Sequence, residues 1–171
     1  MGRGDLVVTR RGLSFRGRVY PCTLGRGGTV TTGRKREGDG CTPAGAHRIV
    51  GCLYRPDRVP PGRLPGWAAP TRRDDLWCDD PGAADYNRMV RAPFAPSAER
   101  LWRADPIYDI LLVTDWNWPD ARPGRGSAIF IHIWRRPGAP TAGCVALARE
   151  SLLAILPGLR PGTRLVVPPP G

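Results

Sequence analysis

The sequence predicts a mainly β protein, a single β-rich and sandwich-like domain with short helices. Glycine and proline supply 22 and 20 of the 171 residues, which indicates many turns and few long helices. Hydrophobic residues make up 41%, as in ordinary globular proteins. Short apolar runs with strand-like alternation follow one another along the chain. We expect one domain over residues 1–171, with its core between about residues 5 and 167, because this length suffices for one sizeable core.

The first part of the chain predicts short strands separated by glycine-rich turns. Residues 6–9 and 13–20 predict a hairpin whose turn lies near Gly12. The glycines of residues 25–28 predict a plain turn, because the Gly-Lys-Ser/Thr ending of a phosphate-binding loop is missing. Residues 38–45 are again rich in turn-forming residues and lead into the next strand.

The middle of the chain alternates strands with loops. Residues 47–54 predict a strand, and residues 55–70, rich in Pro, Gly and Arg, predict a long binding loop or lid. Residues 97–102 predict one helical turn. The apolar run at residues 108–115 predicts a strand that is buried on both faces.

The last part of the chain predicts a strand, a helix and a final strand. Residues 127–134 form an apolar, strand-like run that contains a histidine. Leucine and isoleucine recur at helical spacing over residues 148–156, and Pro157 follows directly. Residues 162–167 predict a closing strand, followed by a proline-rich tail that we expect to fray.

The formal net charge is +11, and Lys35 is the only lysine, so arginine carries nearly all the positive charge. A GC-rich genome explains the preference for arginine without any functional meaning. The excess of positive charge is a separate matter, because it attracts polyanions such as nucleic acid, acidic lipid or a carboxylate-rich wall polymer. Charge alone does not choose among these partners.

No targeting signal is evident in the sequence. No apolar run approaches the length of about 18 residues that a membrane span needs, and the start lacks the basic-then-apolar pattern of a signal peptide. The chain as written therefore predicts a cytoplasmic protein without a membrane span, and we expect a monomer.

Five cysteines are present, so at least one thiol stays unpaired whatever disulfides form. Cys41, His47 and Cys52 are close enough in sequence to suggest a metal clip, but their spacing matches no familiar zinc pattern. The alternative, that these cysteines are small buried apolar residues, is favoured. We expect neither a metal nor a cofactor.

A cysteine and a histidine near the C-terminus suggest nucleophilic catalysis. His132 lies in the apolar run, and Cys144 follows Gly143 one short loop later. An imidazole that takes the thiol proton produces a thiolate able to attack a carbonyl. Gly143 lets the backbone approach a ligand closely, so that its amide and that of Cys144 point at a developing oxyanion. The structural alternatives, a buried cysteine and a core histidine, remain open on pattern alone, and a serine triad is disfavoured because no Gly-x-Ser-x-Gly motif is present.

Several stretches resemble the catalytic domain of bacterial L,D-transpeptidases. His132 and the sequence Thr-Ala-Gly-Cys-Val at residues 141–145 resemble that family's histidine and its Ser/Thr-x-Gly-Cys-hydrophobic motif. Thr-Pro-Ala-Gly at residues 42–45 resembles the family's turn before a strand, and the closing helix and strand resemble its ending. Residues 78–81 and 86–88 are similar to a divergent branch, in which proteins without obvious export signals are common. The resemblance covers most of the chain.

The resemblance implies a cysteine acyltransferase that acts on peptidoglycan stem peptides. Cys144 would attack the carbonyl of a diaminopimelyl–D-alanine bond, form a thioacyl-enzyme and pass the acyl group to an amine, with His132 shuttling protons. Carbapenem-type inhibitors would then acylate Cys144. The resemblance also implies the periplasm or cell envelope as the working compartment.

Three departures from the family pattern concern the surroundings of the pair. The spacing between His132 and Cys144 is shorter than usual, Ala142 replaces a frequent second histidine, and Ala146 replaces an arginine or asparagine. These departures bear on specificity, because the nucleophile and the base are both retained.

Substrate binding needs charged and polar partners. Arg135 and Arg136 follow the histidine strand and are candidates for binding substrate carboxylates, since arginine binds carboxylates bidentately. A solvated surface role is the alternative for both. The candidates for holding the amino group of the stem peptide are Asp79, Asp80, Tyr86 and Asn87.

The sequence leaves two alternative functions open. The same Cys-His pair would serve an L,D-carboxypeptidase or amidase that uses water as acceptor. A non-catalytic basic domain that binds nucleic acid is the alternative from another class, but helix-turn-helix, zinc-finger and RNP-type signatures are missing. We therefore expect peptidoglycan peptides rather than nucleic acid as partners.

Overall fold

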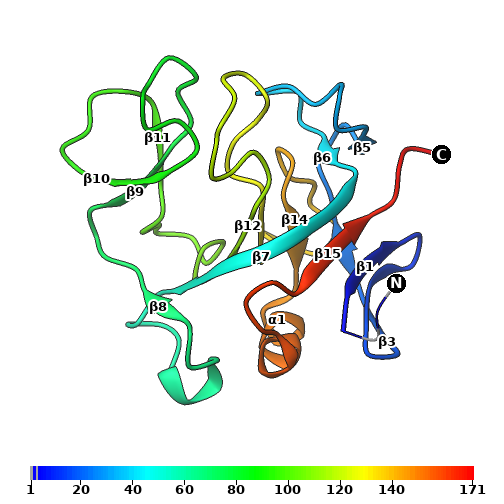
Figure 1. Cartoon of the computed structure of the whole chain (residues 1–171). Helices are drawn as coiled ribbons and strands as arrows, with labels where there is room; N and C mark the ends of the chain where they lie inside the picture. Colours follow the sequence, from blue (N-terminus) through cyan, green and yellow to red (C-terminus); the bar gives the residue numbers. More distant parts are fainter. Residues whose placement is uncertain (1, 3) are drawn as a thin grey trace.

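The protein is built around one large, curled β-sheet (Figure 1). In the computed structural model, which describes residue 2 and residues 4–171, the strand order is β3-β2-β1-β15-β7-β12-β13-β14-β4, with β8 paired to β7. The end strands β3 and β4 are separated in sequence only by Pro21, and β2 also contacts β4, so the sheet curls towards closure. These strands are β1 (Leu6–Thr9), β2 (Gly12–Phe15), β3 (Arg18–Tyr20), β4 (Cys22–Thr23), β7 (Gly45–Tyr54), β8 (Ala69–Pro70), β12 (Ile110–Thr114), β13 (Phe130–Ile133), β14 (Val145–Leu147) and β15 (Arg164–Val167).

The long strand β7 joins the two halves of this sheet. Its first part pairs with β15, from Gly45 to Arg48, and the remainder pairs with β12, up to Tyr54. It is the long cyan arrow that crosses Figure 1. The strand predicted at residues 47–54 is therefore confirmed, and it begins slightly earlier.

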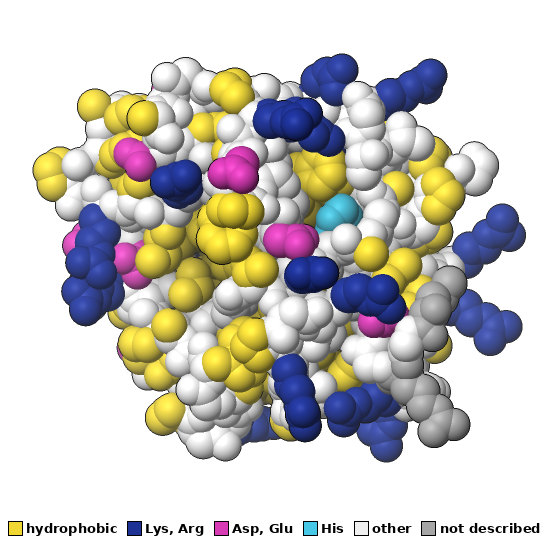
Figure 2. Space-filling model, in the orientation of Figure 1, with side chains coloured by type: hydrophobic (Ala, Val, Ile, Leu, Met, Phe, Trp, Pro, Cys, Tyr) yellow, Lys and Arg dark blue, Asp and Glu magenta, His cyan; other side chains and the backbone are white. Residues whose placement is uncertain are grey.

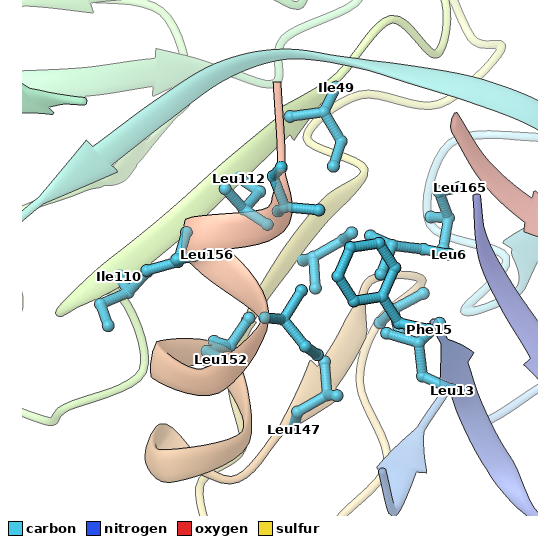
Figure 3. Close-up of a cluster of buried hydrophobic side chains, with 14 of the residues drawn as sticks. Leu6, Leu13, Phe15, Ile49, Ile110, Leu112, Leu147, Leu152, Leu156 and Leu165 are labelled. Atoms are coloured by element: carbon cyan, nitrogen blue, oxygen red, sulfur yellow. The ribbon is translucent and has the colours of Figure 1, made fainter. Parts of the chain in front are cut away.

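The main core lies inside the curl and is closed by the only α-helix of the described residues, α1 (Arg149–Ile155). Figure 3 shows Leu152 of the helix and Leu156 of the 3-10 turn η2 (Leu156–Gly158) in one cluster with side chains from both halves of the sheet, among them Leu13 and Leu112. Leu152 and Leu156 are fully buried. The predicted helix and closing strand are confirmed, and so is the mainly β fold class.

A second apolar cluster covers the other face of β12 and β13. Along β13, Ile131 and Ile133 point into the main core, whereas Phe130 packs in the second cluster. A three-stranded sheet in the order β10-β9-β11 contributes Trp77 to this cluster. All five residues of β12 are buried, as predicted. The strands of the small sheet are β9 (Asp75–Cys78), β10 (Met89–Arg91) and β11 (Ala98–Arg100).

Two predicted elements differ from the structure. The strand predicted at residues 13–20 is broken into β2 and β3, because Arg16 and Gly17 both have positive φ (48° and 80°), the backbone of a tight hairpin turn. The helical turn predicted at residues 97–102 is wrong, since this segment forms β11 and pairs with β9. Burial of Leu101 in the second cluster outweighs the local helix propensity.

The remaining elements are short. The loop predicted at residues 55–70 contains the 3-10 turn η1 (Pro61–Arg63) and ends in β8. Strands β5 (Thr29–Val30) and β6 (Thr42–Pro43) pair in parallel and flank the turn at residues 25–28. Among the residues that the structure describes, no helix is long and apolar enough to cross a bilayer.

Candidate active site

The thiol of Cys144 lies immediately before β14 and is buried, with 9% of the residue exposed. Its Sγ donates to the main-chain oxygen of Ala128 (3.0 Å) and accepts the main-chain N–H of Phe130 (3.4 Å). Burial raises the pKa of this thiol to about 12, which the hydrogen bond from Phe130 only partly offsets. The resting group is therefore a neutral thiol whose proton is directed at Ala128.

The imidazole of His132 is also buried, and its tautomer follows from its hydrogen bond. Nδ1 lies 2.8 Å from the main-chain oxygen of Ile133. A carbonyl only accepts, so Nδ1 carries the proton and Nε2 is free to accept one. Burial lowers the pKa of His132 to about 4, which keeps the ring neutral near pH 7. A neutral ring with a free Nε2 has the form that a general base requires.

Strand pairing places the two groups on the same face. Strands β13 and β14 are parallel neighbours, with His132 opposite Ala146. Side chains alternate along a strand, so Cys144 projects to the same side as Ala146 and lies diagonally across from His132. Ala146 is fully buried in β14 and lines the same cavity as Cys144 and His132.

The loop before Cys144 is tightly constrained. Gly143 has a φ of +148°, and a Cβ at this position would lie 2.9 Å from the main-chain oxygen of Cys41. The hydroxyl of Thr141 donates to the main-chain oxygen of Cys144 (2.7 Å) and accepts the N–H of Gly143 (3.1 Å). Only glycine satisfies both the backbone angle and the close approach of Cys41.

Cys144 and His132 both line one cavity of about 720 Å³. Cationic and acidic side chains share its walls, and Lys35 favours the thiolate of Cys144 whereas Glu99 opposes it. The ammonium of Lys35 is almost fully buried, 2.8 Å from the carboxylate of Asp39. The charged residues that line the cavity are Arg26, Lys35, Glu37, Asp79, Glu99, Arg103, Arg135 and Arg136.

Three of the six predicted substrate-binding residues line this cavity. Arg135 and Arg136 are exposed and lie just beyond β13, and Asp79 directly follows β9. A buried oxygen of Asp79 has no hydrogen-bond partner among the described residues. Asp80 does not line the cavity, and its carboxylate accepts the N–H of Gly82 (2.8 Å).

Tyr86 and Asn87 lie behind the cavity wall and hold residues 126–128 in place. The Asn87 amide oxygen accepts the N–H of Ala128 (3.0 Å) and the indole N–H of Trp77 (3.0 Å). The hydroxyl of Tyr86 donates to Glu37 (2.5 Å) and accepts the N–H of Gly126 (3.1 Å). These contacts hold Ala128 in a left-handed backbone conformation with a φ of 52°. The carbonyl of Ala128 thereby stays in position to accept the hydrogen bond from the Cys144 thiol.

Several residues that line the cavity were not predicted from the sequence, among them Lys35, Glu99 and Tyr108. The sequence does distinguish Lys35, because it is the only lysine in an arginine-rich chain. Glu99 falls in the segment that we expected to be helical, and only its pairing in β11 directs it to the cavity. Nothing in the sequence near Tyr108 marks it.

The structure also describes the surroundings of His47 and the distribution of charge on the surface. His47 Nε2 lies 2.9 Å from the main-chain oxygen of Pro43, and within residues 2 and 4–171 no group of three His, Cys, Asp or Glu side chains could hold a metal ion. On the face shown in Figure 2, Lys and Arg side chains are spread out, with Asp and Glu among them.

Comparison with known proteins adds the family. The sequence matches the YkuD family, described as the L,D-transpeptidase catalytic domain, over residues 6–167. No curated protein and no solved structure gives a match. The matched region includes the cavity, both strands that carry the Cys144–His132 pair, and the closing helix and strand. The protein therefore belongs to the YkuD family of L,D-transpeptidase catalytic domains.

Proposed function

We propose that the protein is a peptidoglycan L,D-transpeptidase with Cys144 as nucleophile and His132 as proton carrier. One observation carries this proposal: the thiol and the imidazole face the same cavity from two hydrogen-bonded parallel strands. The neutral imidazole with a free Nε2 supports the base role. No third polar side chain is required to set the tautomer, because the Ile133 carbonyl accepts the proton of Nδ1.

In the acylation step the Cys144 sulfur attacks the carbonyl carbon of the diaminopimelyl–D-alanine bond. As the S–C bond forms, the thiol proton leaves Ala128 and passes to His132 Nε2, which raises the electron density on sulfur when it is needed. The tetrahedral intermediate then collapses, the C–N bond breaks, and His132 returns the proton to the departing nitrogen of D-alanine. A thioester on Cys144 remains.

In the second step an amine of another stem peptide attacks the thioester. His132 accepts a proton from that amine, the S–C bond breaks, and Cys144 recovers its proton, so the enzyme is regenerated with a new amide bond. Water in place of the amine would give the hydrolase, an L,D-carboxypeptidase or amidase. The Cys144–His132 pair serves both reactions equally, so the choice depends on the acceptor.

The oxyanion of the tetrahedral intermediate requires hydrogen-bond donors. We assign this role to the main-chain N–H groups of Gly143 and Cys144, at the end of the constrained loop. In the resting state Gly143 donates to the Thr141 hydroxyl (3.1 Å), so substrate binding must exchange that partner for the oxyanion. The Thr141 hydroxyl keeps its own hydrogen bond to the Cys144 carbonyl during this exchange.

The charges of the cavity suit a stem peptide that carries both carboxylates and an amino group. We assign the binding of carboxylates to Arg135 and Arg136, which are exposed and line the cavity. Asp79, with its unpartnered buried oxygen, is the best candidate for the amino group. We assign to Tyr86 and Asn87 the support of the cavity wall near Asp79. Asp80, which does not line the cavity, adds negative charge at a greater distance.

Incubation with a carbapenem and intact mass spectrometry tests the nucleophile. We expect one covalent adduct on the natural chain and none on Cys144→Ala, whereas Cys41→Ala, a control at a half-exposed thiol, should react normally. An adduct of equal yield on Cys144→Ala would refute the proposal. Product analysis with a tetrapeptide donor, with and without an added D-amino acid acceptor, then separates transfer from hydrolysis.

A further inference from the structure

The imidazole of His132 ends a series of aromatic rings that pack perpendicular to one another. Trp77 and Phe130 have ring centroids 4.9 Å apart, Phe130 and Tyr108 are 6.1 Å apart, and Tyr108 and His132 are 5.3 Å apart, with interplanar angles between 83° and 88°. Edge-to-face packing is the favoured arrangement for such rings. Tyr108 is the member of the series that touches the imidazole, and only 5% of it is exposed.

Tyr108 also has a polar anchor at its other end. Its hydroxyl donates to the carboxylate of Glu99 on β11 (2.8 Å). Arg103 lies 3.8 Å from the same carboxylate, and its guanidinium carbon is 5.5 Å from the centre of the Tyr108 ring. Strand β11 is itself fixed by its pairing with β9. The small sheet therefore holds the hydroxyl end of Tyr108, and the ring of Tyr108 packs against His132.

Two contacts of different kinds restrain the imidazole of His132. The hydrogen bond from Nδ1 to the Ile133 carbonyl sets the tautomer and holds one edge of the ring. The perpendicular packing of Tyr108, with ring centroids 5.3 Å apart, adds a contact that limits tilting of the ring. Although His132 lines the cavity, only 6% of it is exposed, so the packing of Tyr108 limits the access of water to the ring.

We propose that Tyr108, anchored by Glu99, is a positioning residue that fixes the orientation of the His132 imidazole and excludes water from it. The proposal rests on the proposed function for its catalytic meaning, but not for its geometry. Arg103 and Asp105 are the charged groups that act on His132, and they act in opposite directions, so packing rather than charge dominates the surroundings of the ring.

The test combines an NMR titration with acylation kinetics. The chain contains only two histidines, so His47 serves as an internal reference in a ¹⁵N-edited titration of the imidazoles. In Tyr108→Leu we expect the His132 pKa to rise by about one unit or more, because water reaches the ring. The maximum rate of carbapenem acylation should fall by roughly 10- to 100-fold with little change in the half-saturating concentration, since a misplaced base slows the chemical step.

Two further variants separate the ring from its anchor. Tyr108→Phe keeps the packing and loses the hydroxyl, so the His132 pKa should stay close to that of the natural chain while the rate falls moderately. Glu99→Gln retains an acceptor for the hydroxyl, so the His132 titration should resemble that of the natural chain more closely still. Tyr54→Leu is the control, because it removes a ring packed against the main core and leaves the cavity lining intact.

The outcomes distinguish this proposal from the proposed function. An unchanged His132 titration and an unchanged acylation rate in a folded Tyr108→Leu would overturn the positioning role. Absence of acylation in the natural chain would refute the proposed function, while the titration would still report whether Tyr108 controls the imidazole. Should Tyr108→Leu fail to fold, Tyr108→Phe and Glu99→Ala decide the question, and an unaltered rate in both would refute the role of the anchor.

Discussion

The main-chain N–H of Phe130 points at the sulfur of Cys144, 3.4 Å away, across the junction of β13 and β14. The same sulfur directs its proton to the Ala128 carbonyl. Both contacts come from the histidine-bearing segment, so the segment that carries the proposed base also restrains the proposed nucleophile. A hydrogen bond to sulfur favours the thiolate, but burial opposes it more strongly, and the pKa of Cys144 is raised to about 12.

This raised pKa predicts slow alkylation of Cys144 by iodoacetamide at neutral pH. An ordinary thiol is half ionised near pH 8.5, whereas Cys144 becomes ionised only as the pH approaches about 12. The alkylation rate should therefore rise with pH without a plateau at low pH, and half-exposed Cys41 should be labelled first. Peptide mapping after timed labelling measures both rates. Rapid, pH-independent labelling of Cys144 below pH 7 would indicate a preformed ion pair with His132 instead.

Replacement of His132 should abolish most of the acylation without unfolding the protein. In His132→Asn we expect the rate of carbapenem acylation to fall by roughly 10²- to 10⁴-fold, the usual contribution of a general base. His47→Asn is the matched control, because His47 is equally buried but lies outside the cavity lining, where it pairs with the Pro43 carbonyl and packs on Trp116. Stopped-flow or quenched mass spectrometry gives the rates. Equal losses in the two variants, per folded molecule, would argue against a special role for His132.

Gly143→Ala should damage both stability and activity. The added Cβ would meet the Cys41 carbonyl at 2.9 Å and place a side chain at a φ of +148°, which costs about 1–3 kcal/mol of unfolding free energy. Gly138→Ala is the control for backbone angle alone, since its φ is +77° and no atom lies within 4 Å of the new Cβ. Urea unfolding and carbapenem acylation check the pair. A Gly143→Ala protein as active as Gly138→Ala would show that the close approach of the Cys41 carbonyl does not require glycine at this position.

Asp79→Asn should weaken the binding of a stem peptide that carries a free amino group. An ammonium–carboxylate hydrogen bond contributes about 1.5–3 kcal/mol, so we expect KM to rise roughly tenfold or more while kcat changes less. Asp85→Asn, at an exposed position outside the cavity lining, is the control. Steady-state kinetics with donors that bear or lack the amino group measure the effect. A larger increase in KM for Asp80→Asn than for Asp79→Asn would move the ammonium site to Asp80.

Asn87→Ala should be among the most destabilising single changes near the site. It leaves the N–H of Ala128 and the indole N–H of Trp77 without their shared acceptor, and each orphaned buried group costs about 1–3 kcal/mol. Asn117→Ala is the comparison, because Asn117 also has positive φ but is less deeply buried. The midpoint and slope of urea unfolding give the free energies. An Asn87→Ala protein as stable as Asn117→Ala would contradict the supporting role of the amide.

The sequence by itself determined the mainly β fold, the buried strand at β12, the closing helix and strand, and the position of the cysteine behind glycine. These are local properties, since apolar alternation, turn residues and helical spacing act over a few neighbours. The same local reasoning predicted a helical turn at residues 97–102, where propensity favours a helix but β9 supplies the hydrogen bonds for a strand.

Only the tertiary structure decided what faces the cavity. Whether Asp79 or Asp80 reaches it, and whether Asn87 binds substrate or supports Ala128, depends on how the small sheet packs against β12 and β13. The contact between Tyr108 and His132 joins segments that approach only when β12 and β13 pair. Side chains that carry no periodic signal acquire their roles from long-range packing, because neither their type nor their spacing records which distant strand they will meet.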